Sequence, residues 1–150
     1  MAGLVAGCTS EPAIGSANVT VSTGFPILSA FATRGSGVVE FSDRPAGTSC
    51  AEPEKQRAVD AYHDQLSVQM AATDGTYPIA SEQSSGAAYL RLFDDCTNLG
   101  CFDASAVFDS GTVTVQGGAD AATGTIDARG SNAQAANLVV SGSFEATYCP

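Results

Sequence analysis

The chain carries little positive charge. Six basic residues stand against sixteen acidic ones, which gives a formal net charge of −10 over 150 residues. A surface of this sign repels the phosphates of nucleic acids, so nucleic acid is not an expected partner. Only 15% of the residues are charged, and the acidic ones are spread along the sequence. That spread is more typical of a feature that keeps a protein in solution than of a cation site.

Long hydrophobic runs and most catalytic motifs are also missing. No segment approaches the ~18–20 consecutive apolar residues that a membrane-spanning helix needs. The only histidine, His63, is flanked by carboxylates in Asp60-Ala-Tyr-His-Asp64, an arrangement that suits a general base or a metal ligand. No Gly-x-Ser-x-Gly motif completes a hydrolase site, and no Cys-x-x-Cys pair or second histidine completes a zinc site. We therefore expect no catalytic residues.

A short motif near the N-terminus indicates export. Leu4-Val-Ala-Gly-Cys8 resembles the lipobox, the site at which bacterial lipoprotein signal peptides are cut before a cysteine that then carries lipid. Seven residues precede Cys8 and none is basic, which departs from a complete signal peptide. We expect residues 1–17 to be residual signal and polar tether, and residues 18–150 to be one domain. An ordinary small-residue tail with a free cysteine is the alternative.

The other four cysteines form an even set, compatible with two disulfides in an oxidising compartment. Cys96 and Cys101 enclose a short loop with turn-forming residues, so we expect them to pair. By elimination, Cys50 would then pair with Cys149. The sequence leaves this connectivity open, because four cysteines allow three pairings.

Acidic residues and one amide surround the Cys96–Cys101 loop. They are Asp94, Asp95, Asn98 and Asp103. Carboxylate and carbonyl oxygens are the ligands that Ca²⁺ prefers, so calcium is the one cofactor that the sequence suggests. The spacing does not match an EF-hand, however, and a solvated acidic loop is the favoured interpretation.

Alternation of apolar and polar residues dominates from Asn18 onward, the period typical of half-buried strands. At Ser110-Gly111 the apolar positions shift from even to odd numbers, which predicts a bulge or tight bend at Gly111. We count about nine short strands, with at most one short helix near residues 54–66. The pattern predicts an all-β fold, an antiparallel β-sandwich of the jelly-roll or immunoglobulin type, with a closed barrel as the alternative.

Strings in the C-terminal third carry a resemblance to a protein family. They are Ser110-Gly-Thr-Val-Thr-Val115, Thr123-Gly-Thr-Ile-Asp-Ala128 and Val140-Ser-Gly-Ser-Phe-Glu-Ala146, followed by a near-terminal cysteine. In this order they are similar to uncharacterised secreted lipoproteins of myxobacteria and related bacteria. The resemblance extends to Asp74-Gly-Thr-Tyr-Pro78 and Ser42-Asp-Arg-Pro45. It implies a β domain behind a lipobox that ends in a C-terminal meander of strands, and it carries no catalytic residues.

Four aromatic residues are expected to point away from the core: Tyr62, Tyr77, Tyr89 and Phe93. Exposed aromatic rings are a common means by which small β domains bind sugars or peptides, and the alternative is that these rings cover a second buried face. The sequence thus predicts a cell-envelope lipoprotein, anchored through lipid on Cys8 at the outer membrane or cell surface. Its β domain would be a non-catalytic binding or structural module with an envelope protein or glycan as partner. A small-ligand carrier barrel and, last, a hydrolase that uses His63 are the alternatives.

Overall fold

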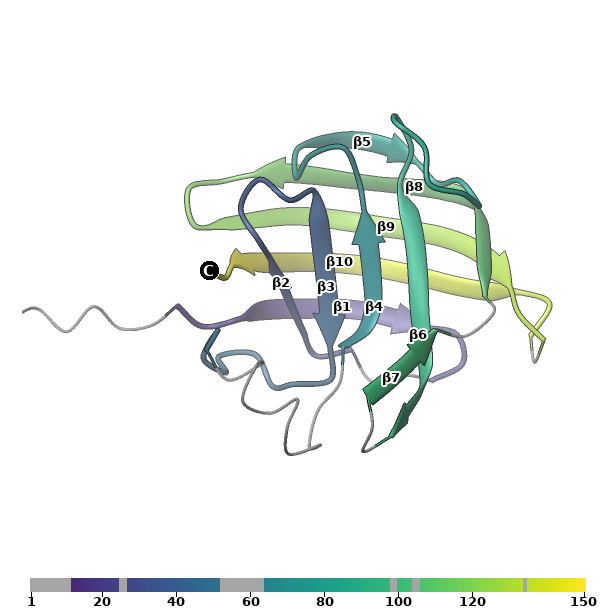
Figure 1. Cartoon of the computed structure of the whole chain (residues 1–150), viewed down its shortest axis with the longest axis horizontal. Coiled ribbons are helices and arrows are strands. Elements are labelled where there is room, and N and C mark those ends of the chain that lie inside the picture. Colours follow the sequence, from purple (N-terminus) through teal and green to yellow (C-terminus); the bar gives the residue numbers. More distant parts are fainter. Residues whose placement is uncertain (1–11, 25–26, 52–63, 98–99, 104–105, 134) are drawn as a thin grey trace, which may run out of the picture.

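A computed structural model describes residues 12–24, 27–51, 64–97, 100–103, 106–133 and 135–150. These residues contain ten strands and no helix (Figure 1). The strands are β1 (Gly15–Val21), β2 (Ser29–Ala32), β3 (Val38–Ser42), β4 (Asp64–Gln69), β5 (Gly75–Pro78), β6 (Tyr89–Thr97), β7 (Gly100–Asp103), β8 (Val107–Gly117), β9 (Ala121–Ser131) and β10 (Leu138–Tyr148). The predicted helix near residues 54–66 lies mostly outside the described residues, and its last three positions belong to β4. No helix in the described part of the chain is long and apolar enough to span a membrane.

All ten strands belong to one hydrogen-bonded sheet. Their order is β5-β8-β9-β10-β1-β2-β3-β4-β6-β7, and β10 also pairs in parallel with β2. Figure 1 shows the sheet in two layers, with β2, β3, β4 and β6 running steeply across β5, β8, β9, β10 and β1. The all-β prediction is confirmed. The predicted sandwich of two separate sheets is not, because a continuous ladder connects the two layers.

The sheet folds over at the junction of β1 and β2. These strands pair only between Gly15 and Ala30 and between Ser16 and Ser29, so β1 leaves β2 early and continues along β10. β5, at one end of the order, meets β6, the strand next to the other end, where Ile79 bridges Ala88. The sheet is therefore curled round one interior, like half of a barrel.

Alternate residues of the strands fill this interior, as the period-two pattern predicts. In β10 the even-numbered apolar residues Leu138, Val140, Phe144 and Ala146 are buried. The rings of Phe41 in β3 and Phe144 in β10 meet edge to face at 5.1 Å between centroids. Since these strands belong to different layers, this contact joins the two layers through the centre of the core.

The shift of apolar parity in β8 has the predicted origin. The register between β8 and β9 slips between Phe108 and Ser110, so Asp109 is the extra residue of a β-bulge. Because of the bulge, the apolar side chains on both sides of it face the interior: Phe108 before it and Val113 after it are both buried. It lies two residues before Gly111, the position named from the sequence, and Gly111 itself has a φ of +110°.

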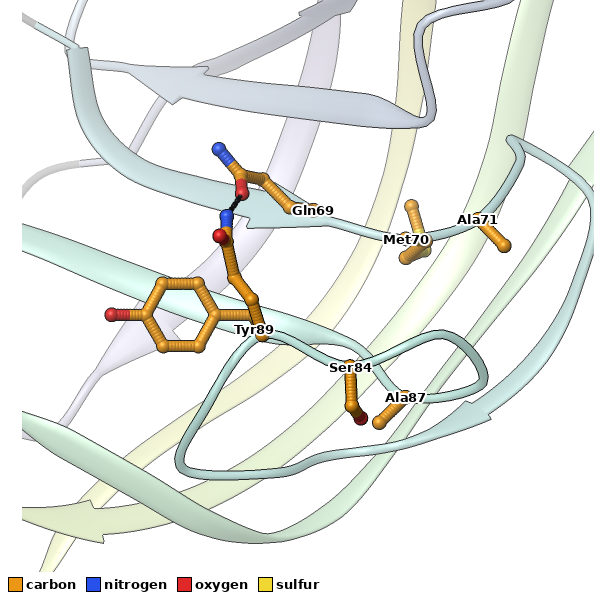
Figure 2. A pocket seen from close by; sticks show the side chains of 7 residues that line it. Gln69, Met70, Ala71, Ser84, Ala87 and Tyr89 are labelled. Atoms are coloured by element: carbon orange, nitrogen blue, oxygen red, sulfur yellow. Dashed lines mark hydrogen bonds between the residues drawn. The ribbon is translucent and has the colours of Figure 1, made fainter.

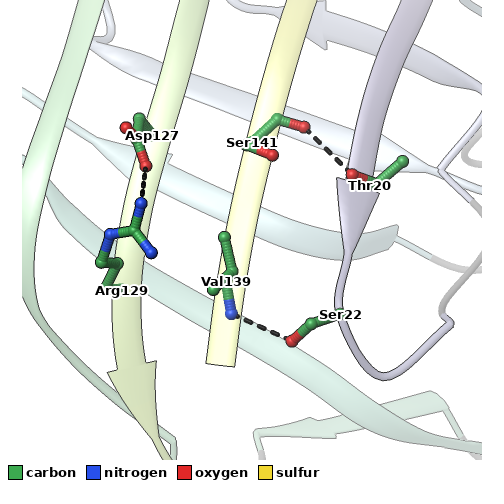
Figure 3. A network of polar contacts seen from close by, with 6 residues as sticks. All are labelled: Thr20, Ser22, Asp127, Arg129, Val139 and Ser141. Carbon is green, nitrogen blue, oxygen red and sulfur yellow. Dashed lines mark hydrogen bonds and ion pairs between the residues drawn. The ribbon is translucent and has the colours of Figure 1, made fainter. Parts of the chain in front are cut away.

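The outward side of β9, β10 and β1 is polar. Figure 3 shows how side chains there reinforce the β1–β10 pairing: Thr20 Oγ1 donates to the Ser141 carbonyl at 3.4 Å, and the Val139 amide donates to Ser22 Oγ at 3.0 Å. On the same side of β9, Arg129 Nη2 lies 3.7 Å from Asp127 Oδ1. Both are more than 60% exposed, so this ion pair adds little stability.

A disulfide joins Cys50 to Cys149 over a sequence separation of 99 residues, with the two Cα atoms 5.4 Å apart. This is the pairing that elimination predicted. Beside it lies a small apolar cluster, separate from the main core, made of Ile14, Phe31 and Cys149, with Cys50 packed against it. Ile14 is only 2% exposed and β1 already begins at Gly15. Residues 12–17, which the sequence assigns to the tether, therefore pack on the domain.

Candidate functional site

Several predicted site residues lie outside the described residues. They are Cys8, the expected lipid attachment site, His63, Tyr62 and Asn98. Lipidation of Cys8 and a functional role of His63 stay predictions.

The predicted disulfide loop is a β-hairpin of β6 and β7. Cys96 and Cys101 are opposite each other in its register, a placement that suits the predicted bond. The bond itself stays a prediction. Asp94, Asp95 and Asp103 belong to the same hairpin. Within the described residues no group of three or more histidine, cysteine, aspartate or glutamate side chains is placed to hold a metal ion, and calcium binding stays untested.

Tyr77 does not point away from the core, contrary to prediction. It is paired with Val113 in the β5–β8 ladder and packs against the main core. Its hydroxyl donates to the Asp74 carbonyl at 2.8 Å and so closes the turn that precedes β5. Thr76, its neighbour in β5, takes the outward position. The sequence-based error arose because a four-residue strand is too short to show which parity faces inward.

Tyr89 and Phe93 do lie on the outward side of β6, as predicted. Their neighbours Leu90 and Leu92 are buried in the core, so the odd-numbered residues of β6 face the other way. Arg91 lies between the two aromatic residues, and its guanidinium carbon is 5.3 Å from the centroid of the Phe93 ring. This stacking orders a cation on the face that also carries Tyr89.

A groove of about 330 Å³ opens beside Tyr89 (Figure 2). Its lining comes from the end of β4, the connection between β5 and β6, and the start of β6: Gln69, Met70, Ala71, Gln83, Ser84, Ala87 and Tyr89. Pairing of Gln69 with Tyr89 in the β4–β6 ladder places both side chains on the outward face. The groove exists because the β5–β6 connection returns over the end of β4.

An amide pair crosses the groove. Gln83 Nε2 donates to Gln69 Oε1, and this contact ties the β5–β6 connection to β4 (Figure 2). The bond uses one donor hydrogen and one acceptor site. Each amide can make further bonds, because a glutamine side chain has two N–H donors and an oxygen with two lone pairs.

A second hollow, of about 430 Å³, adjoins the first and shares Gln83 and Tyr89 with it. Ser81, Glu82 and Arg91 complete its lining. We call the two hollows together the Tyr89 groove. It offers an aromatic ring, amides, hydroxyls and one ion of each sign, and it is open to solvent along its length. This set of groups suits reversible binding of a polar, chain-like ligand.

The sequence identified Tyr89 but not the rest of this site. Gln69 and Gln83 are 14 residues apart, and nothing in their local pattern brings them together. The sequence did contain a partial signal for the site. Tyr89 and Arg91 alternate with Leu90 and Leu92, so they are expected on the outward face of the strand.

The opposite face of the molecule carries a row of small polar residues. Successive ladder pairs connect Thr76, Thr114, Thr125, Ser143 and Asn18 across five strands. The hydroxyls of Thr76 and Thr114 are hydrogen-bonded at 3.2 Å. Such cross-strand pairs stabilise the sheet, and the row is typical of the solvated face of an antiparallel sheet.

No protein-family model, curated protein or solved structure matches the chain. The site must therefore be interpreted from its own geometry.

Proposed function

We propose that the chain is a lipid-anchored protein of the bacterial cell envelope whose β domain binds a glycan in the Tyr89 groove, without chemistry of its own. The observation that carries the binding role is the groove itself, in which the Gln69–Gln83 amide pair lies beside an outward-facing tyrosine. An aromatic ring packs against the C–H face of a sugar, while amides and hydroxyls bond its hydroxyl groups. The lipobox-like Leu4-Val-Ala-Gly-Cys8 and the Cys50–Cys149 disulfide support export.

The charge of the molecule favours a neutral glycan or an amino sugar over a polyanion. The chain has a net charge of −10, and Glu82 lines the groove next to Arg91. An anionic polymer would therefore be repelled at long range, although Arg91 could pair with an isolated acidic group.

The packed interior favours an outward-facing site over the carrier-barrel alternative. A carrier requires an apolar cavity inside the barrel. Here Phe41 and Phe144 meet inside the sheet, and Leu66, opposite Phe41 in the β3–β4 ladder, is fully buried, as is Val140. We further propose that the two layers act as a sandwich-like scaffold for the groove.

Glycan binding is tested by titrating the ¹⁵N-labelled protein with chitohexaose and cellohexaose and following the amide signals. We expect shifts at residues 69–71 and 83–91. Tyr89→Ala should weaken binding about tenfold, because one aromatic contact is lost. Thr125→Ala, an exposed polar change on the opposite face, is the matched control and should bind as the wild type does. Unchanged affinity in Tyr89→Ala, or shifts confined to other regions, would show that the groove is not a glycan site.

The anchor is tested by the intact mass of the native gene product from a bacterial membrane fraction. We expect a mature chain that starts at Cys8 and carries acyl groups, and we expect Cys8→Ala to leave the membrane fraction. Recovery of a chain that contains Met1 and no lipid would contradict the anchor and leave the glycan site to stand alone.

A further inference from the structure

The chain segment that leads into β1 is held by a loop rather than by the sheet. Residues 12–14 run antiparallel to residues 47–50, with Ala13 and Ser49 forming an isolated bridge. Three backbone hydrogen bonds connect the two segments: Ile14 N–H to Thr48 O at 2.8 Å, Gly47 N–H to Ile14 O at 3.0 Å, and Cys50 N–H to Pro12 O at 2.8 Å. The two segments are thus joined to each other, and we call them together the unit.

What attaches this unit to the sheet is the small cluster around the disulfide. The Ile14 side chain packs with Phe31, which lies on the outward side of β2, and with Cys149, which follows β10. Cys149 is itself fixed to β2, because its amide donates to the Ala32 carbonyl at 2.7 Å. Cys50 belongs to the loop and Cys149 follows β10, so the disulfide cross-links the unit to the sheet in addition to the chain itself.

We propose that the Cys50–Cys149 disulfide is a redox-controlled lock on the N-terminal segment, and that its reduction releases residues 12–14 and 47–50 from the sheet and from each other while the sheet stays folded. The two segments separate because an isolated two-stranded contact is marginally stable in water. In the oxidised protein the bond keeps the Cα atoms of the two cysteines 5.4 Å apart and confines the loop over Phe31. Without the bond, the packing between the unit and the sheet that the structure describes consists of the apolar contacts of the Ile14 side chain. Two flanks of the unit lead into anchored residues: the buried Arg44 precedes residue 47, and Ala17 of β1 follows residue 14.

The lock opens by thiol–disulfide exchange with a dithiol. One thiolate of the dithiol attacks the sulfur of Cys50, the more exposed of the two cysteines, and Cys149 leaves as a thiolate. The second thiol of the dithiol then attacks the mixed disulfide and frees Cys50. The dithiol loses two electrons and becomes a disulfide, while Cys50 and Cys149 gain one electron each and take up the two protons.

Release would lengthen the connection between the domain and whatever precedes it. Each residue freed from the surface adds up to about 3.3–3.6 Å of reach. If Cys8 carries lipid, as the proposed function states, the lock sets how far the domain stands from the membrane. That consequence rests on the proposed function, whereas the lock itself does not.

The lock is tested by amide hydrogen exchange in the chain with Cys96→Ala and Cys101→Ala, so that the Cys50–Cys149 bond is the only one of the two expected disulfides left to reduce. Upon addition of dithiothreitol, we expect the amides of Ile14, Gly47 and Cys50 to exchange at least about tenfold faster. The amide of Ala17, which donates to the Leu28 carbonyl, and the amides of β9 should stay more protected than the three amides of the unit, because they open only with the sheet. Cys50→Ala with Cys149→Ala should reproduce the pattern without reductant.

Two results would overturn the lock. If Ile14, Gly47 and Cys50 stay as protected after reduction as before it, the unit does not need the bond. If the amides of β9 exchange as fast as those of the unit after reduction, the bond holds the whole domain and not the segment. Neither measurement involves lipid or glycan. A failure of the lock proposal can therefore be told apart from a failure of the proposed function.

Discussion

Replacing both Cys50 and Cys149 by alanine is expected to lower the free energy of unfolding by about 4 kcal/mol. The bond closes a loop of 99 residues, and a cross-link over such a length strongly restricts the unfolded chain. A loss of this size is a large fraction of the ~5–15 kcal/mol by which single domains are stable. Urea unfolding of the oxidised wild type and the double variant, followed by far-ultraviolet circular dichroism, measures the difference.

The second cysteine pair provides the matched control for this prediction. Cys96 and Cys101 are opposite each other in one hairpin, so a bond between them encloses only a few residues. In the chain-entropy model its removal costs about 2 kcal/mol, roughly half the effect of the long-range bond. Equal unfolding midpoints for the wild type and the Cys50/Cys149 variant would show that the long-range bond does not stabilise the domain through the unfolded chain.

The second large effect is expected at Gly142, in the middle of β10. Gly142 has a φ of +146°, a conformation that other residues rarely adopt. A Cβ atom there would lie 2.0 Å from the Asn18 carbonyl oxygen and 2.7 Å from the Val19 Cα, both in the backbone of β1. Since β1 also pairs along this part of β10, neither strand can move away without breaking the ladder. We expect Gly142→Ala to cost at least about 3 kcal/mol of stability.

Gly86 separates the two causes of this cost. It has a similar φ, +151°, but a Cβ atom there would have no heavy atom within 4 Å apart from its chain neighbours. Gly86→Ala thus carries the backbone strain alone, about 1–3 kcal/mol. The difference between the two variants in thermal or urea unfolding should be about 1–3 kcal/mol, the cost of the steric contact. Equal losses would mean that β1 accommodates the methyl group.

Which residues face inward in the long strands was predictable from the sequence. Each of β8, β9 and β10 has 11 residues, long enough for the period of two to show itself several times. Even the bulge at Asp109 left a signal, because an extra residue shifts all later apolar positions by one. The same reasoning failed at Tyr77, in a strand of only four residues.

The pairing of the first strand with the last and the Tyr89 groove were beyond prediction. The first strand, β1, lies between the last strand, β10, and β2, and no local pattern records such a neighbour. A single curled sheet and two stacked sheets place the same alternate residues inside, so periodicity cannot separate them. The groove likewise depends on the way the β5–β6 connection returns over the end of β4.

By itself, the sequence determined the all-β class and the inward face of the long strands, because each depends on residue type and on spacing along the chain. It allowed three cysteine pairings, of which the structure contains Cys50–Cys149. Only the tertiary structure decided that one sheet curls on itself, that residues 12–14 dock under the disulfide, and that Gln69, Gln83 and Tyr89 share a groove. These features arise from contacts between residues distant in sequence, where backbone pairing and side-chain packing select one arrangement among many that share the same local pattern.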